Sequence, residues 1–233
     1  MKRQLQKLTL TLISCCFMVS PIVFSPLAFS ESLSRPGAKS DPALLRKWLA
    51  KVDELIKTNG PSANYYGTKA QLYEWLQNPK SAIEQYTLAI KFTPEDPSYL
   101  PRRARCFRKM KRWNEALSDY NSAVSGGLKD VETFVGRSLT ELSLEKYEQA
   151  LADAKSAIAL SPNDSNAWFA KGHAELGMGQ AKDCIRSISK AIELSPGDPA
   201  FYRMRSQAHD MLGDKRQATR DLVLSRQFEK NAK

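Results

Sequence analysis

Small side chains recur along this sequence at a fixed interval of 34 residues. One series is Ala82, Ala116, Ala150, Cys184 and Ala218, and another, seven residues further on, is Ala89, Ala123, Ala157, Ala191 and Ser225. Between them stand Tyr86, Tyr120, Ala154, Ile188 and Leu222. Because spacings of three and four residues place side chains on one face of an α-helix, each trio predicts a helix with a narrow face that another helix can approach closely. Pro94, Pro162 and Pro196, or the pair Gly126 and Gly127, end these helices.

A second helix is predicted upstream of each of these. Its large apolar residue is Tyr66, Leu100, Phe134, Trp168 or Tyr202, and its small residue one turn later is Ala70, Ala104, Ser138, Gly172 or Ser206. The repeating unit is therefore a helix, a short turn and a helix. The period divides the chain into units 63–96, 97–130, 131–164, 165–198 and 199–230. Positions are counted from the start of each unit, so that Ala82 is position 20.

A single helix is predicted ahead of the first unit, over residues 41–60. Asp41 can cap it, with Pro42 in its first turn. Its apolar stripe consists of Leu45, Trp48, Leu49, Val52 and Ile56. Trp48 stands 34 residues before Ala82, and a bulky residue at that place favours a capping helix that closes the first unit.

These helical hairpins resemble tetratricopeptide repeats (TPR). The resemblance covers units 63–96 to 199–230 and rests on five degenerate repeats in unbroken register. It implies an all-α, right-handed superhelix in which each hairpin buries its small-residue face against the next. It also implies a non-catalytic scaffold or adaptor, which holds a partner peptide or helix in the concave groove of the solenoid.

The N-terminus has the pattern of an export signal. Residues 1–7 are basic, residues 8–29 carry no charge, and small residues Ala28 and Ser30 mark a cleavage site. We therefore expect a signal peptide over 1–30, a flexible linker over 31–40 and a periplasmic or secreted protein. Two alternatives stay open: the segment is retained as a membrane anchor through residues 8–29, or Cys15 is lipidated within a lipoprotein-like box.

The remaining cysteines and acids are expected to be structural. Cys106 and Cys184 lie 78 residues apart, more than two repeats, so we expect two buried thiols without a disulfide. Glu141 and Glu175 share position 11, and one repeat separates them by about 10 Å, so we expect two solvated or salt-bridged acids rather than a catalytic pair. Only two histidines, His173 and His209, are present, and the sequence contains no metal, phosphate-loop or nucleophile motif. No enzyme activity, cofactor or metal is expected.

Basic residues at position 7 of the units predict pairs within each hairpin. Where position 7 is arginine, position 23 is aspartate, which gives Arg103 with Asp119, Arg137 with Asp153, and Arg205 with Asp221. Lys69 and Lys171 face Gln85 and Ser187 instead. Because the guanidinium fork fits a carboxylate, this matching predicts ion pairs between the two helices of a unit.

The chain is basic overall, with 35 Lys and Arg against 25 Asp and Glu and a formal charge of +10. The densest run, RRARCFRKMKR at 102–112, lacks the interleaved aromatic residues of a nucleic-acid platform, and no nucleic acid is expected as a partner. A dense field of one sign favours encounter with anions instead.

The TPR resemblance places positions 2, 5, 6, 9, 12 and 13 on the groove. Carried over to this chain, it gives the candidate groove residues Gln71, Trp75, Arg102, Arg105, Arg108, Lys109, Val135, Leu139, Leu142, Phe169, His173, Arg203, Met204 and Gln207. The second unit supplies four cations and the third an apolar strip, so we expect an acidic partner with an apolar anchor. The carboxylate clamp of some TPR co-chaperones is absent, since Gly67 and Gln71 replace its lysine and asparagine. The alternative function is a basic module that docks on anionic envelope lipid or polysaccharide. The sequence names neither the partner nor the oligomeric state.

Overall fold

The structure is a computed structural model of the chain, and it describes residues 41–231. The expected signal peptide and linker lie outside the described residues. The helices are α2 (Pro42–Asn59), α3 (Ala63–Trp75), α4 (Pro79–Phe92), the 3-10 helix η2 (Pro97–Tyr99), α5 (Leu100–Lys109), α6 (Trp113–Ser125), α7 (Val131–Ser143), α8 (Tyr147–Leu160), α9 (Ser165–Gly177), α10 (Ala181–Leu194), α11 (Pro199–Met211) and α12 (Lys215–Asn231). Over residues 41–231 there is no strand.

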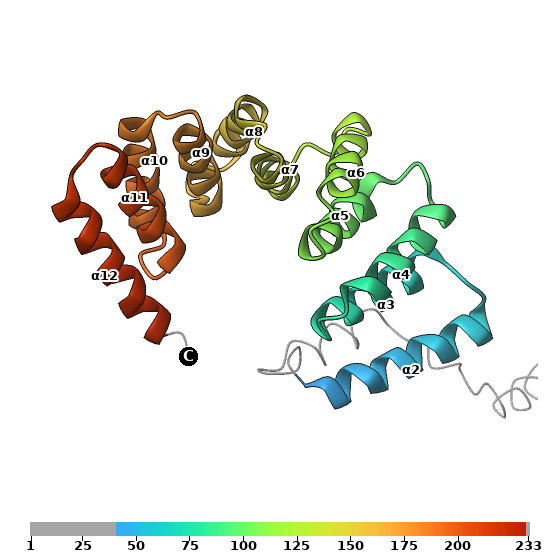
Figure 1. Ribbon diagram of the computed structural model, residues 1–233. Coiled ribbons are helices and arrows are strands. Elements are labelled where there is room, and N and C mark those ends of the chain that lie inside the picture. The colour runs from blue at the N-terminus through green and yellow to red at the C-terminus, as the bar shows by residue number, and fades with distance from the viewer. Residues whose placement is uncertain (1–40, 232–233) are drawn as a thin grey trace, which may run out of the picture.

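Successive helices pair into hairpins, and the hairpins stack into an open arch (Figure 1). Helices α3, α5, α7, α9 and α11 lie along the inner side of the arch, and their partners lie along the outer side (Figure 1). Helix α2 packs beside α3 at one end, and α12 forms the other end. The predicted all-α solenoid is confirmed. No helix between residues 41 and 231 combines the length and the apolar character needed to cross a membrane.

Aspartates at the junctions between hairpins start the inner helices. Asp130 Oδ1 accepts the backbone N–H of Thr133 at 2.7 Å, and Asp164 Oδ1 accepts that of Ala167 at 2.8 Å. Asp198 caps α11 in the same manner. Because the first N–H groups of a helix have no intrahelical partner, each aspartate fixes the residue at which its helix begins.

The turn inside every hairpin depends on one residue with a left-handed backbone at position 15. Gly179 and Gly213 occupy it with φ of 76° and 78°. Gln77, Lys111 and Glu145 occupy it with φ of 55° to 58°. Glycine adopts this conformation freely, whereas a side chain with a Cβ raises its free energy. In the three hairpins that have Gln77, Lys111 or Glu145 at this position, the packing of the two helices therefore imposes the turn geometry.

The small residues of the 34-residue series form the core between hairpins. Ala82, Ala116, Ala150 and Cys184 are completely buried. Cys106 and Cys184 are free thiols, as predicted, and burial raises the pKa of each to about 12. These side chains act as small apolar residues in helix–helix contacts.

Arginine at position 7 joins two hairpins through one planar side chain. The predicted Arg–Asp pairs are all bidentate, with Nε and Nη2 donating to Asp119, Asp153 or Asp221 over 2.5 to 2.8 Å. The third nitrogen, Nη1, donates to position 25 of the preceding hairpin, on Thr87, Asn121 or Ser189. Lys69, also at position 7, donates from Nζ to Oδ1 of Asp53 in α2 at 2.6 Å. Asp53 stands 34 residues before Thr87 and so corresponds to position 25 of a preceding hairpin. Helix α2 therefore occupies the place of the outer helix of an earlier hairpin.

Candidate functional site

The second hairpin begins differently from the others because of Pro101. The inner helices of the other hairpins start at position 1, whereas α5 starts three residues later, at Leu100, after the 3-10 turn η2. Proline lacks a backbone N–H and is tolerated only in the first turn of a helix, so α5 cannot extend further toward its N-terminus. This turn carries Tyr99 across the backbone of α3. Its ring lies over Gly67, where an added Cβ would be 2.5 Å from Cε1.

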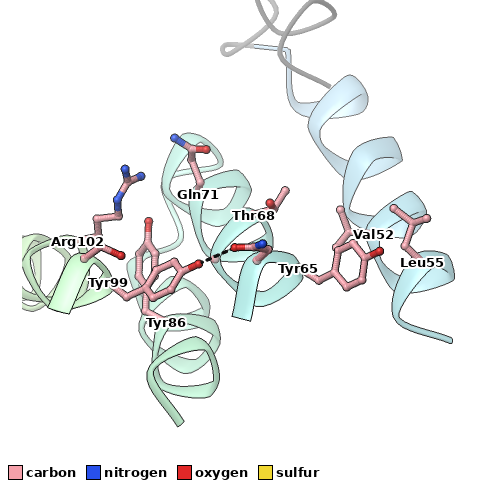
Figure 2. A pocket seen from close by; sticks show the side chains of 11 residues that line it. Val52, Leu55, Tyr65, Thr68, Gln71, Tyr86, Tyr99 and Arg102 are labelled. Atoms are coloured by element: carbon pink, nitrogen blue, oxygen red, sulfur yellow. Dashed lines mark hydrogen bonds between the residues drawn. The ribbon is translucent and has the colours of Figure 1, made fainter. Parts of the chain in front are cut away.

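A cavity of about 430 Å³ opens beside Tyr99 on the inner side of the arch. Figure 2 shows α3 as its base, with α2 on one side and the start of α5 on the other. The hydroxyl of Tyr99 donates to Asn64 Oδ1 at 3.2 Å, across the junction between the first two hairpins. The residues that line the cavity are Val52, Leu55, Asn64, Tyr65, Gly67, Thr68, Gln71, Tyr86, Ser98, Tyr99 and Arg102. We call this the α2–α3–α5 pocket.

A second hollow of about 350 Å³ lies further along the inner side, where α5, α7 and α9 meet. Its lining residues are Arg105, Arg108, Tyr120, Val131, Glu132, Val135, Gly136, Asp164 and Asn166. We call this the α5–α7–α9 hollow. Of the candidate groove residues, the structure thus groups Gln71 with Arg102 in the first cavity, and Arg105, Arg108 and Val135 in the second.

Helix α5 carries five cations, of which Arg103 and Arg105 form ion pairs. Arg105 Nη2 lies 2.9 Å from Glu74 Oε2 and its Nη1 lies 2.6 Å from Glu132 Oε1. Although burial alone would lower the pKa of Arg105, the neighbouring Glu74 raises it above its ordinary value. Arg105 is therefore held within the fold. Arg102, Arg108 and Lys109 have no carboxylate partner among residues 41–231, and Arg108 hydrogen-bonds the side chain of Tyr120.

Glu74, which stands at groove position 12 of the first unit, is a buried carboxylate. Its side chain is 7% exposed, and its Oε1 accepts the hydroxyl of Tyr86 at 2.5 Å. Burial and the adjacent Glu74 raise the pKa of Tyr86 above its ordinary value. The charge of Arg105 offsets the cost of burying this carboxylate.

The apolar candidates lie mostly within the packing between hairpins. Leu142 and Met204 are only 6% and 8% exposed. The rings of Phe169 and Phe201 make a tilted contact with centroids 5.2 Å apart, and burial lowers the pKa of the neighbouring His173. Leu139 is partly buried against the cluster that contains Leu142. Val135 lines the α5–α7–α9 hollow, whereas Leu139 and Leu142 line neither of the two hollows described above.

The remaining candidates are dispersed along the arch. Trp75 packs against the cluster between α2 and α3. Arg203 pairs with Glu229 at 2.6 Å, and Gln207 is exposed on α11. None of these three lines either hollow.

Glu141 and Glu175, which share position 11, differ in their surroundings. Glu175 accepts hydrogen bonds from Lys171 at 2.5 Å and from Ser187 at 2.6 Å. Glu141 is equally buried, but its Oε2 has no hydrogen-bond partner. Burial, with a contribution from Asp153, raises the pKa of Glu141 to about 7. The expectation of a solvated or salt-bridged acid is therefore wrong for Glu141, because Arg137 is already bound to Asp153. Within residues 41–231, no cluster of three or more His, Cys, Asp and Glu residues is arranged to hold a metal.

Sequence reasoning missed the walls of the α2–α3–α5 pocket. Val52 was assigned only to the apolar stripe of the capping helix, and Leu55 was not singled out. Tyr99 occupies position 3, which is not among the groove positions of the resemblance. The signal for Tyr99 was Pro101 at position 5, which delays the start of α5.

A family model matches two segments of this chain, and several solved structures share its fold. The tetratricopeptide repeat model matches residues 63–96 and 165–198, the same bounds as the first and fourth predicted units. Among solved structures, MamA from Desulfovibrio magneticus RS-1 is 17% identical, with a TM-score of 0.65 over 72% of this chain and 96% of that one. A tetratricopeptide repeat protein from Parabacteroides merdae is 18% identical, with a TM-score of 0.68 over 84% and 77%. YrrB, described as a TPR protein with an unusual peptide-binding site, is 18% identical, with a TM-score of 0.62 over 76% and 91%.

These likenesses establish the TPR solenoid fold. No curated protein matches the sequence significantly. The division into five repeats and the choice of groove residues remain predictions.

Proposed function

We propose that this protein is a non-catalytic scaffold that holds a partner polypeptide against the inner side of its arch. The observation that carries the proposal is the arrangement of α5. Arg102, Arg108 and Lys109 have no carboxylate partner between residues 41 and 231, whereas the position 7 arginines are bound within the fold. A partner segment with acidic residues supplies the missing carboxylates, and the two hollows on the same side receive its apolar side chains.

The site of action that we propose is outside the cytoplasm. This part of the proposal rests on the basic residues 1–7 followed by the uncharged residues 8–29. Intact mass of the protein recovered from the cell envelope or the medium distinguishes a cleaved signal from a retained anchor or a lipid on Cys15.

The test places a photo-crosslinking amino acid at Arg102 or Lys109, on the inner side, in the full chain. A matched chain carries it at Lys155, which is exposed on the outer helix α8. We expect protein adducts from the two inner positions that are absent at Lys155. Adducts that are the same at all three positions would contradict a groove function.

Charge reversal then tests the role of the cations. Arg102→Glu with Lys109→Glu is expected to abolish capture of the crosslinked partner, and Lys155→Glu with Lys182→Glu to leave it unchanged. Arg105 is unsuitable for this test because its reversal would leave Glu74 buried without a counter-charge. Flotation with phosphatidylglycerol vesicles checks the alternative: vesicle binding without a protein adduct would favour docking on anionic lipid.

A further inference from the structure

The lining of the α2–α3–α5 pocket indicates which side chains of the ligand bind there, an inference that rests on the proposed function. We propose that this pocket receives an apolar side chain of the bound polypeptide, while an acidic residue one or two places away binds Arg102. Helix α2 is then one wall of the binding site as well as the end of the solenoid.

The apolar part of the pocket comes from three helices. Val52 and Leu55 of α2 line one side, Tyr65 of α3 stands next to them, and Tyr99 forms the opposite wall (Figure 2). Aromatic and branched walls around a cavity favour an apolar occupant. The volume of about 430 Å³ lies in the lower part of the range for ligand pockets. It therefore accommodates one side chain with its neighbouring backbone, whereas a helix about 10 Å wide does not fit.

The polar side chains Asn64, Thr68, Gln71, Ser98 and Arg102 of the pocket all carry N–H or O–H groups that can donate, and Arg102 adds a positive charge. None of the eleven residues that line the pocket is acidic. Arg102 is exposed and binds no carboxylate, and the side chains of Gln71 and Thr68 have no hydrogen-bond partner among the described residues. Asn64 already accepts from Tyr99 through its amide oxygen, which leaves its N–H groups to donate. An anion is the group that such a set of donors and one cation binds.

A bound polypeptide in an extended conformation would continue from this pocket into the α5–α7–α9 hollow. Arg108 and Val135 line the α5–α7–α9 hollow, so a chain that leaves the first pocket meets a second cation and a second apolar residue. The two acids of this hollow already have partners, since Glu132 binds Arg105 and Asp164 caps α9. The continuity of the pocket with the hollow favours an acidic residue inside an extended polypeptide over a free anion or a lipid headgroup.

The probe is a phage-displayed library of random twelve-residue peptides selected on the full chain. Peptides selected on the wild type and lost on Arg102→Glu are synthesised with blocked ends, and their binding is measured by calorimetry. We expect an apolar residue within two places of an Asp or Glu. Replacing that acid in the peptide with its amide, or Arg102 with Ala, is expected to weaken binding about tenfold, as loss of one charge-assisted hydrogen bond does.

Three controls make the result specific to this pocket. Lys155→Ala, the matched loss of an exposed cation on the outer side, is expected to change affinity by less than about twofold. Ser98→Trp fills the exposed rim of the pocket without changing charge and is expected to abolish binding. Circular dichroism melting confirms that each variant keeps the wild-type fold.

A benzoylphenylalanine at the apolar position of the peptide identifies the pocket walls. Crosslinks to α2 or to the start of α5 support the proposal. Crosslinks only to α7 or α9, with affinity unaffected by Arg102→Ala, would overturn the pocket assignment and leave the groove function standing. The proposal also fails if no selected peptide depends on Arg102, or if inorganic phosphate or phosphatidylglycerol vesicles bind in an Arg102-dependent way where peptides do not.

Discussion

Nη2 of Arg105 lies 2.9 Å from Oε2 of Glu74, so a side chain of the second hairpin neutralises a carboxylate buried in the first. The two residues are far apart in the sequence, and the pair joins α3, the base of the α2–α3–α5 pocket, to α5, one of its sides. Arg105 therefore stabilises the junction between the first two hairpins, while Arg102 on the same helix contributes charge to the pocket. Mutating each residue separately distinguishes the two roles.

Arg105→Ala is expected to lower the free energy of unfolding by about 1 to 3 kcal/mol, because it leaves Glu74 without its counter-charge. The value falls below that for a fully buried pair because the Arg105 side chain is 40% exposed and partly screened by water. Urea unfolding of the full chain measures it. Arg102→Ala, on the same helix, should change stability by less than about 0.5 kcal/mol, and an equal loss in both variants would refute the assigned roles.

Arg137→Ala removes a side chain that holds Asp153 through two nitrogens and Asn121 through a third. Since Asp153 is only 8% exposed at its side chain, we expect a loss of about 2 to 4 kcal/mol in the free energy of unfolding. Arg137→Lys keeps the charge but not the fork, and should recover only part of that loss. An unchanged melting temperature for Arg137→Ala would show that the repeated arginine has no structural role.

Glu141 is expected to make stability depend on pH. Its pKa in the folded chain is about 7, above the ordinary value of 4.5, so the folded state binds this proton more tightly than the unfolded state. Its contribution to stability is therefore present below about pH 4.5 and is lost as the pH rises to about 7, with an upper limit of about 3 kcal/mol. The groups that face it are Asp153, Arg137 and Lys146.

Glu141→Gln removes this titration. We expect the variant to be more stable than the wild type at pH 8 and to approach it at pH 4.5, as measured by urea unfolding across that range. Burial lowers the pKa of His173 and gives a dependence of opposite sign, which is present in both proteins and cancels in their difference. A difference that is constant with pH would contradict a raised pKa at Glu141.

Glu145→Gly is expected to stabilise the third hairpin. Glu145 is exposed and has φ of 58°, a conformation that raises the free energy of a residue with a Cβ by about 1 to 2 kcal/mol. Part of the gain is offset by the greater freedom of glycine in the unfolded chain. The expected net gain is about 0.5 to 1 kcal/mol in thermal unfolding. The reverse change, Gly179→Ala at φ of 76°, should lower stability by a similar amount.

The features that the sequence predicts correctly are those that repeat. The small residues every 34 places, the Arg–Asp pairs and the all-α solenoid follow from one spacing rule applied throughout the chain, since side chains at equivalent positions have equivalent neighbours. The contact between Arg103 and Asp119 could be predicted because the same pairing of arginine with aspartate recurs at Arg137 and Arg205.

The features that it does not predict belong to single hairpins. Pro101 delays α5 and brings Tyr99 over Gly67, and Arg105 pairs with Glu74 across a junction that no other hairpin builds in this way. Glu141 lacks the lysine and serine that hold Glu175. Such departures depend on which neighbours already have partners, and this requires the positions of side chains in three dimensions.

The close approach of neighbouring hairpins depends on small side chains such as that of Ala150. This residue is completely buried between α8 and its neighbours, in a cluster with Leu142, Ala154 and Ala170. Ala150→Leu adds three carbon atoms where none fit, and the resulting displacement of helices is expected to lower the free energy of unfolding by about 1 to 3 kcal/mol or more. Ala152→Leu is the matched control, because Ala152 lies two residues away on the same helix and is exposed. Urea unfolding should separate the two variants, and equal stability would show that the hairpins do not rely on a small residue at this contact.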